Sequence, residues 1–209
     1  MSLHKGILIT SIMKKTLSFL VLSILFFNLS SQTLRENVKI KTKLFWIEYS
    51  ERLEQPTSIQ YTVICPNGTA SRSGMDFYTN DSIHTSDNAD YANNVYDKGH
   101  LAPAADFNCD KETLYQTFSY LNCALQNQYL NRGVWRFLEA QEREWAKTEM
   151  VVVSIKLNFN GKCEVLPTKA TVPSGFLKTI ELKKSKKVYN FYFENTKPIK
   201  STFWEYQIK

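Results

Sequence analysis

The segment Tyr96–Phe107 constrains this chain more than any other, because it places a histidine among ionisable and backbone-stiffening residues. It reads Tyr-Asp-Lys-Gly-His-Leu-Ala-Pro-Ala-Ala-Asp-Phe, and its His100 is one of only three histidines in 209 residues. A neutral imidazole is well suited to accept a proton near pH 7. Gly99, directly before it, permits backbone angles that other residues avoid. On residue type alone, a half-buried histidine at the end of a strand accounts for the segment better than a catalytic one.

A second segment, residues 130–146, has the pattern of an amphipathic helix. Its apolar residues recur at helical spacing, with charged residues between them. Asn131, Trp135 and Glu139 stand one turn apart and are expected to share one side of the helix. Taken singly, Asn131 is best explained as a capping residue and Glu139 as a solvated charge.

Together the two segments resemble the DNA/RNA non-specific endonucleases, a family of ββα-metal (His-Me finger) nucleases. Residues 97–106 resemble the family block D-R-G-H-L-A-P-A-A-D, with Lys98 where the family has Arg. Residues 131–139 resemble its block Asn-x-Gly-x-Trp-x-x-Leu-Glu. The resemblance extends over residues 49–178 and is most specific across these two blocks. It implies an α+β fold: a mixed, mainly antiparallel β-sheet core with a ββα-metal active-site motif and flanking helices.

The resemblance also implies a role for each of five side chains. His100 would be the general base that activates water. Asn131 would hold a single Mg²⁺, or Mn²⁺ in its place, and the ion would keep several of its waters. Glu139 would orient metal-bound water. Asn122 would act beside them in catalysis, and Gln126 would line the substrate pocket.

Two cations are candidates for binding the phosphates of the substrate. Lys98 keeps the charge of the family's Arg but lacks its planar fork. Arg72 lies in a loop-rich stretch, where a solvated arginine is as good an explanation as a phosphate contact. Binding through phosphates would make cleavage indifferent to sequence and sugar. The implied function is Mg²⁺-dependent hydrolysis of phosphodiester bonds in DNA and RNA, with no small-molecule cofactor.

Two other functions fit the same sequence. A nucleic-acid-binding protein could keep this fold and lose turnover, since Ser154-Ile155-Lys156 stands where the family has Thr-Gly-Pro. A toxin nuclease delivered to competitors would be distinguished by a cognate inhibitor encoded beside it. The joint presence of His100, Asn131 and Glu139 favours an active nuclease over the binding protein.

Residue patterns predict the secondary structure around these segments. Asp110 is a suitable N-cap for a short helix, and branched or aromatic runs predict strands. We expect a helix at 110–116 and strands at 44–49, 58–64, 117–126, 150–155, 189–193 and 203–206. The strand at 117–126 is expected to pair with the strand that carries His100, and the strongly apolar strand at 150–155 to lie in the centre of the sheet. Residues 34–43 are expected to be loose, Pro56 to interrupt the chain, and Asn160-Gly161 to form a tight hairpin.

Residues 1–31 have the pattern of a secretory signal, with Met13 as an alternative start. A positive Lys14-Lys15 precedes an apolar run over residues 16–27 that is short for a membrane span. We therefore expect a secreted or periplasmic protein without stable membrane association after removal of the signal. Its single nuclease domain is expected to be residues 32–209.

Composition adds little to the nucleic-acid hypothesis. The 26 Lys and Arg residues exceed the 20 Asp and Glu residues by six, but three of the lysines lie in residues 1–31. The predicted domain thus has 23 basic and 20 acidic residues, a formal charge of +3. So weak an excess is as typical of an ordinary soluble surface as of a protein with a polyanionic partner.

The four cysteines favour disulfides in a chain with a signal segment. Three pairings are possible, and we favour Cys109 with Cys123, because the short helix between them would return the chain to a neighbouring strand. A zinc site is the rival interpretation, but no Cys-x-x-Cys spacing supports it.

Overall fold

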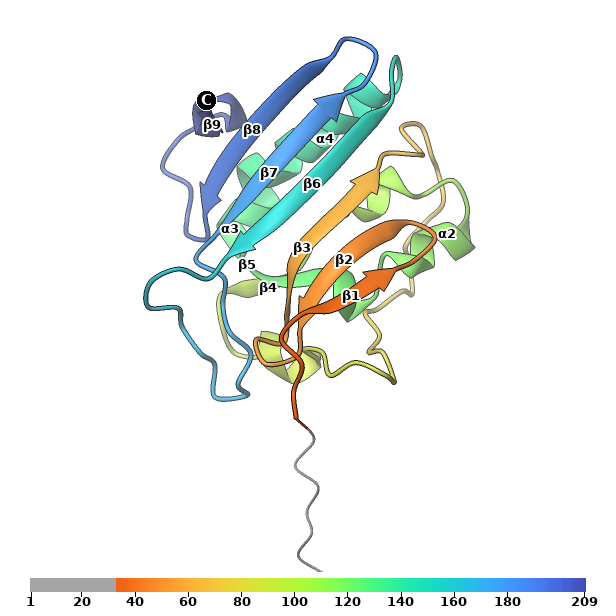
Figure 1. The fold of residues 1–209 in the computed structure, drawn as a ribbon. Coiled ribbons are helices and arrows are strands. Elements are labelled where there is room, and N and C mark those ends of the chain that lie inside the picture. Colours follow the sequence, from red (N-terminus) through yellow and green to blue (C-terminus); the bar gives the residue numbers. More distant parts are fainter. Residues whose placement is uncertain (1–32) are drawn as a thin grey trace, which may run out of the picture. The chain divides into compact units, whose positions relative to one another are not determined.

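Alternating apolar residues build a large antiparallel sheet in the computed structural model, which describes residues 33–209 (Figure 1). Its strands, in spatial order, are β1 (Val38–Lys41), β2 (Phe45–Ser50), β3 (Gln55–Thr62), β6 (Val151–Asn158), β7 (Gly175–Leu182), β8 (Lys187–Glu194) and β9 (Gln207–Ile208). Buried and more exposed residues alternate along most of these strands, so only one face of the sheet belongs to the core. The apolar run predicted to be a central strand is β6, in the middle of the sheet.

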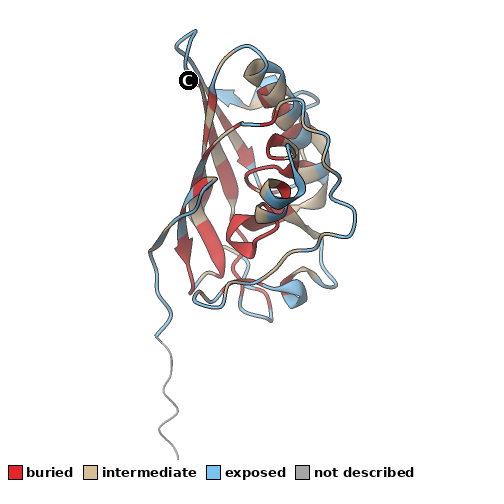
Figure 2. Cartoon of the chain, turned by 90° about the vertical axis from the view of Figure 1, so that its right-hand side faces the viewer, coloured by how far each residue is buried: buried red, intermediate tan, exposed pale blue. Residues whose placement is uncertain are grey.

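A smaller antiparallel sheet pairs β4 (Tyr96–His100) with β5 (Cys123–Asn127). The helical segments are η1 (Asn88–Tyr91), η2 (Ala104–Asp106), α2 (Lys111–Gln116), η3 (Tyr120–Asn122), α3 (Gln128–Leu130), η4 (Asn131–Trp135), α4 (Arg136–Ala146) and η5 (Phe203–Tyr206). The main helices lie on one side of the large sheet (Figure 2). The predicted α+β fold with a mainly antiparallel sheet is confirmed.

The core between the large sheet and the helices is strongly aromatic. Trp135 is fully buried, and its ring centroid lies 5.3 Å from that of Phe176 and 5.5 Å from that of Phe193. The tilted and edge-on arrangements of these rings are the favourable ones for aromatic pairs. This contact joins η4 to β7 and β8, and so fixes the helical segment that follows β5 on the large sheet.

The helix predicted over residues 130–146 is interrupted. Gly133 has φ −103° and ψ −121°, which are not helical, and η4 is a π-helical turn with a kink at this glycine. Glycine tolerates such angles without steric cost. Asn131 and Glu139 therefore belong to two segments of different direction, and α4 begins only at Arg136.

Several local expectations were wrong because strand pairing overrides local signals. Residues 34–43, expected to be loose, contain β1, which pairs with β2. Pro56 does not interrupt the chain but lies within β3. Asn160-Gly161 belongs to a long connection between β6 and β7 rather than to a tight hairpin.

Two predicted strands are partly helical. Of residues 117–126, only those from Cys123 onward are extended, because Tyr120–Asn122 form η3. Residues 203–206 form η5, and the strand β9 follows it. The predicted helix at 110–116 is confirmed as α2, and the side chain of Asp110 accepts a hydrogen bond from the Thr113 N–H at 2.7 Å.

The predicted signal segment, residues 1–31, lies outside the described residues. Among residues 33–209, no helix has the length and apolar character that crossing a bilayer requires.

The disulfide joins Cys65 to Cys109, not Cys109 to Cys123 as expected, and the Cα atoms of the bridge are 5.4 Å apart. The chain after β3 runs beside the end of η2, where the Cys65 N–H donates to the Asp106 carbonyl at 3.0 Å. That contact brings residue 65 close to residue 109. Cys123 is instead buried in β5, with its sulfur 3.2 Å from the Tyr91 hydroxyl.

We predict that peptide mapping without reduction finds the Cys65–Cys109 bridge and free thiols at Cys123 and Cys163. Replacing Cys65 and Cys109 by serine should lower the free energy of unfolding by about 2–4 kcal/mol, because the closed loop of 44 residues no longer restricts the unfolded chain. Cys163→Ser is the matched control and should leave stability unchanged. Recovery of a Cys109–Cys123 peptide would contradict the structure.

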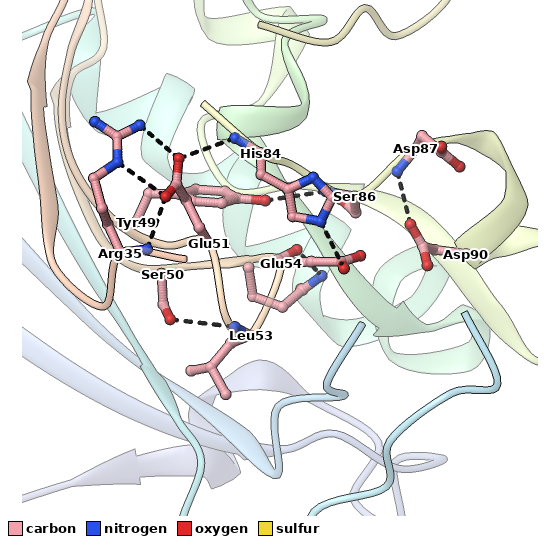
Figure 3. Close-up of polar contacts among 11 residues, drawn as sticks. Arg35, Tyr49, Ser50, Glu51, Leu53, Glu54, His84, Ser86, Asp87 and Asp90 are labelled. Atoms are coloured by element: carbon pink, nitrogen blue, oxygen red, sulfur yellow. Dashed lines mark hydrogen bonds and ion pairs between the residues drawn. The ribbon is translucent and has the colours of Figure 1, made fainter. Parts of the chain in front are cut away.

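A polar network ties the segment before β1 to the turn after β2 and to the loop at His84 (Figure 3). The Glu51 carboxylate accepts from the Arg35 backbone N–H at 2.8 Å, from the Arg35 guanidinium, and from the His84 N–H at 3.1 Å. Its side chain is only 3% exposed. The hydrogen bonds from Arg35 hold the pKa of Glu51 down to about 2. The His84 ring lies 2.9 Å from Glu54 and has no part in the site described below.

We predict that this carboxylate makes stability depend on pH. Because the pKa of Glu51 is lower in the folded chain than its ordinary value of 4.5, its contribution is fully present above pH 4.5 and is lost as pH falls towards 2. Glu51→Gln should lower the free energy of unfolding near pH 7 by roughly 2 kcal/mol and flatten this acid dependence. Denaturant unfolding at several pH values measures both effects.

The control is Glu144→Gln, which removes a surface carboxylate that pairs with Lys147. It should change stability by less than about 0.5 kcal/mol. An unchanged acid dependence in Glu51→Gln would show that the network does not hold this charge.

Candidate active site

The pairing of β4 with β5 places His100, as expected, opposite Cys123 and next to Gly99. A Cβ atom at Gly99 would lie 2.5 Å from Gln126 Oε1 and 2.6 Å from Gln126 Cβ. Contacts this short do not occur, so the glycine is required for close approach of β5, rather than for unusual backbone angles as predicted. The absence of a side chain at residue 99 therefore sets the position of the histidine.

The imidazole of His100 packs between two aromatic rings, tilted against one and edge-on to the other. Its centroid lies 4.6 Å from that of Phe77 and 4.9 Å from that of Phe118. Nε2 is covered and finds no hydrogen-bond partner among the described residues, which leaves Nδ1 as the nitrogen that can face solvent. Burial, and secondly the charge of Arg72, lower the pKa of His100 to about 3. The ring is therefore neutral at physiological pH and free to accept a proton.

Asn122 and Gln126, which were predicted to act in catalysis and in the substrate pocket, are both fully buried. The Asn122 amide donates to the carbonyls of Ala102 and Thr117, each at 2.9 Å, and accepts from the Ala102 N–H at 2.8 Å. Asn122 thus fixes the backbone that follows His100. Gln126 is fully buried against Gly99. Residue 122 belongs to η3 and not to the strand that was predicted over residues 117–126.

Asn131 is held in one orientation by β4. Its Nδ2 donates to Asp97 Oδ2 at 2.9 Å, and Asp97 also accepts two hydrogen bonds from Arg132, at 2.8 and 2.6 Å. Since Asp97 is an acceptor only, the amide must direct its nitrogen to Asp97 and leave Oδ1 for another partner. The sequence identified Asn131 but missed Asp97 and Arg132 as its supports.

Glu139 lies in the first turn of α4, near the buried ion pair of Lys178 with Glu142. Withdrawal from solvent raises the pKa of Glu139 to about 7, and the nearby Lys178 opposes that shift. Lys178 Nζ lies 2.6 Å from Glu142 Oε1, and neither side chain is exposed. The Tyr61 hydroxyl donates to the other oxygen of Glu142 at 3.0 Å. This pair anchors α4 on β7 and β3.

A cleft of about 750 Å³ brings the predicted residues together. His100, Asn131 and Glu139 line it, as do both predicted cations, Arg72 and Lys98. The Lys98 ammonium is already bonded to Asp76 at 2.8 Å and to Asn88, so its charge is partly compensated.

Three further arginines line the cleft, Arg132, Arg136 and Arg143, and the sequence analysis missed them. Arg143 stands one helical turn after Glu139, which is the signal that could have revealed it. Its Nη1 donates at 2.9 Å to Asp106, a fully buried carboxyl from η2. Arg136 makes no ion pair among residues 33–209 and leaves a free cation at the cleft.

A single hard divalent cation fits this donor set. Asn131 offers a neutral oxygen that no described residue bonds, and Glu139 offers a carboxylate on the same wall. Neither at the cleft nor elsewhere do the described residues form a group of three or more His, Cys, Asp or Glu side chains that could hold a metal. A sparse site of this kind suits Mg²⁺, which keeps several waters, and does not suit zinc.

The cleft combines a histidine, an amide and a carboxylate with an excess of cations. A family model described as DNA/RNA non-specific endonuclease matches residues 26–207. The chain belongs to this family.

Curated relatives of this endonuclease chain match it over less than half its length. Mitochondrial endonuclease G from Bos taurus is 37% identical over 84 residues, 39% of this chain and 28% of the relative. Mitochondrial endonuclease G from Homo sapiens is 34% identical over 84 residues, which are also 39% of this chain and 28% of the relative. Mitochondrial nuclease EXOG from Danio rerio is 34% identical over 80 residues, 37% of this chain and 23% of the relative. The matches therefore span about a quarter of these relatives.

A solved structure shares the fold over most of the endonuclease chain. It is the crystal structure of the EndoG/EndoGI complex, which matches with a TM-score of 0.73 and 25% sequence identity. The match covers 82% of this chain and 80% of that chain.

The comparisons overturn the expected secreted or periplasmic location. The curated relatives are all named as mitochondrial proteins. The expectation depended on residues 1–31 alone. An N-terminal segment with lysines and no acidic residue does not by itself distinguish export from targeting to an organelle.

We predict that Lys178→Met destabilises the endonuclease by about 3–5 kcal/mol, because it leaves the Glu142 carboxylate buried without its cation. Lys178→Met combined with Glu142→Leu should recover most of that loss, since it removes both charges together. Denaturant unfolding of the two single variants and the double variant gives the coupling energy. Additive losses would show that the two side chains do not interact as the structure indicates.

Proposed function

We propose that this endonuclease hydrolyses internal phosphodiester bonds of DNA and RNA without sequence preference. His100 acts as general base, and Asn131 holds a single Mg²⁺, which Mn²⁺ can replace. The observation that carries the proposal is the convergence of His100, Asn131 and Glu139 on one cleft that also contains Arg72, Lys98, Arg132, Arg136 and Arg143.

The base is Nδ1 of His100. Because Nε2 is covered by protein, only Nδ1 can accept the proton of a water molecule in the cleft. The positive charge of Arg72 weakens this base in the free protein. A substrate phosphate bound beside Arg72 offsets that repulsion, so the imidazole becomes a stronger base when substrate is present.

Asn131 would hold the ion through Oδ1, in the orientation that Asp97 enforces. Glu139 would orient water at the ion from the same cleft. When bound, the ion stabilises the negative charge that develops on the leaving oxygen.

Phosphate binding accounts for the lack of sequence preference. The cleft presents guanidinium groups and one ammonium, which recognise phosphate oxygens in any sequence and with either sugar. Arg72 and Arg136 make no ion pair with any residue of the described chain, and they supply uncompensated charge to the substrate backbone. Lys98, bonded to Asp76, contributes less charge than the arginine of the family would.

We predict that His100→Ala and Asn131→Ala each reduce cleavage of plasmid and RNA by about 10²- to 10⁴-fold, for different reasons. Raising the Mg²⁺ concentration should partly rescue Asn131→Ala, because Glu139 and the substrate phosphate still hold the waters and the ion. It should not rescue His100→Ala, whereas added imidazole should. Gel assays with Mg²⁺, Mn²⁺ or a chelator measure both dependences.

The matched control is His84→Ala, which removes a histidine far from the cleft and should leave the rate unchanged. Near-normal turnover of His100→Ala would show that His100 is structural. Intact nucleic acid after long incubation of the unaltered chain with either metal would favour the nucleic-acid-binding protein over the nuclease.

A further inference from the structure

The large sheet has a second side, away from the catalytic cleft, which we term the outer face: the outward side of β1, β2, β3, β6 and β7. Figure 1 views the sheet from this side, and Figure 2 shows the main helices on the other. A groove of about 540 Å³ runs across the outer face, and none of its lining residues lines the catalytic cleft.

Strand register arranges the outward side chains in two rows across the sheet. One row is Lys41, Trp46, Gln60, Ser154 and Thr179; the other is Lys39, Glu48, Ser58, Lys156 and Leu177. Neighbouring strands are about 4.8 Å apart, so each row extends for roughly 20 Å. The first row holds neutral amide and hydroxyl groups, such as Gln60, which donates to Ser154 at 3.0 Å.

Trp46 is the distinctive residue of the outer face. It is 57% exposed although tryptophan is among the largest apolar side chains, and Lys41 Nζ lies 4.4 Å from its ring centroid. The Lys41 ammonium lies over the indole ring, and the rest of the exposed indole surface is a platform on which an unstacked base can lie.

The excess of positive charge in the groove favours the binding of a polyanion. Lys39, Lys41 and Lys156 stand against one carboxylate, Glu48, which lies 3.7 Å from Lys39. A duplex keeps its bases stacked inside, so it cannot offer a free base to the indole. A single strand offers both phosphates and bases, and the neutral groups of the first row can bond base edges of any kind.

We propose that the outer face binds single-stranded nucleic acid, with Trp46 stacking on a base and the three lysines contacting phosphates. This binding is separate from the cleavage proposed above and requires no turnover. It would retain a long substrate strand beside the enzyme while another part of the strand occupies the catalytic cleft.

The test measures binding in His100→Ala with a chelator present, so that the little cleavage expected of this variant is suppressed further. An oligothymidylate of about 12 nucleotides, within the range of sheet-based single-strand sites, carries a photoreactive base. We expect crosslinks at Trp46, mapped by mass spectrometry. Trp46→Ala combined with Lys156→Glu should weaken binding about tenfold, whereas Trp46→Phe should retain most of it. Crosslinks confined to the residues of the cleft would overturn the proposal.

A kinetic test uses the chain with His100 intact. Trp46→Ala with Lys156→Glu should raise KM several-fold for a long single strand and leave kcat unchanged, with no effect on a dinucleotide-sized substrate. Lys111→Glu, on α2, is the matched control, because it makes the same charge change as Lys156→Glu away from the groove. Equal KM values for the long strand in the double variant and the control would also overturn the proposal. Because binding is measured without cleavage, a failure of this proposal is distinguishable from a failure of the proposed nuclease activity.

Discussion

The contact between Gly99 and Gln126 is the constraint on which the rest of the site depends. A side chain at residue 99 would force β4 away from β5, and His100 would move with it. The same strand carries Asp97, which holds Asn131. One close approach between two short strands therefore sets the position of His100 and, through the Asp97 carboxylate, the orientation of the Asn131 amide.

Charge in this molecule is separated into layers. Beneath α4, Glu142 and Lys178 compensate each other without solvent, and the fully buried Asp106 pairs with Arg143, which is partly exposed at the cleft. Above them, the cleft has five cations against two carboxylates, those of Asp97 and Glu139. The buried pairs contribute rigidity, and the excess of cations contributes positive charge. The phosphate binding proposed above needs both properties in one small volume.

The sequence predicted the fold class, the central strand and the convergence of His100, Asn131 and Glu139, because these follow from long motifs and strong periodicity. It did not predict the roles of Asn122 and Gln126, since their burial depends on η3 and on the missing side chain of residue 99. The predicted pairing of Cys109 with Cys123 was wrong for a similar reason. The partner of Cys109 is set by the backbone hydrogen bond from Cys65 to Asp106, which joins segments about forty residues apart. Local patterns carry no information about such contacts. Asp97 and the cleft arginines were missed because isolated charges usually lie on solvated surfaces.

The kink at Gly133 sets helix propensity against the geometry of the site. A Cβ atom at this position would meet no atom of another segment within 4 Å, so the constraint on residue 133 is its backbone conformation and not space. Alanine would favour a regular helix through this segment by up to about 1 kcal/mol. A regular helix would change the direction of the segment that carries Asn131, whose Nδ2 now donates to Asp97. Local helix propensity and the placement of Asn131 therefore favour different residues at position 133.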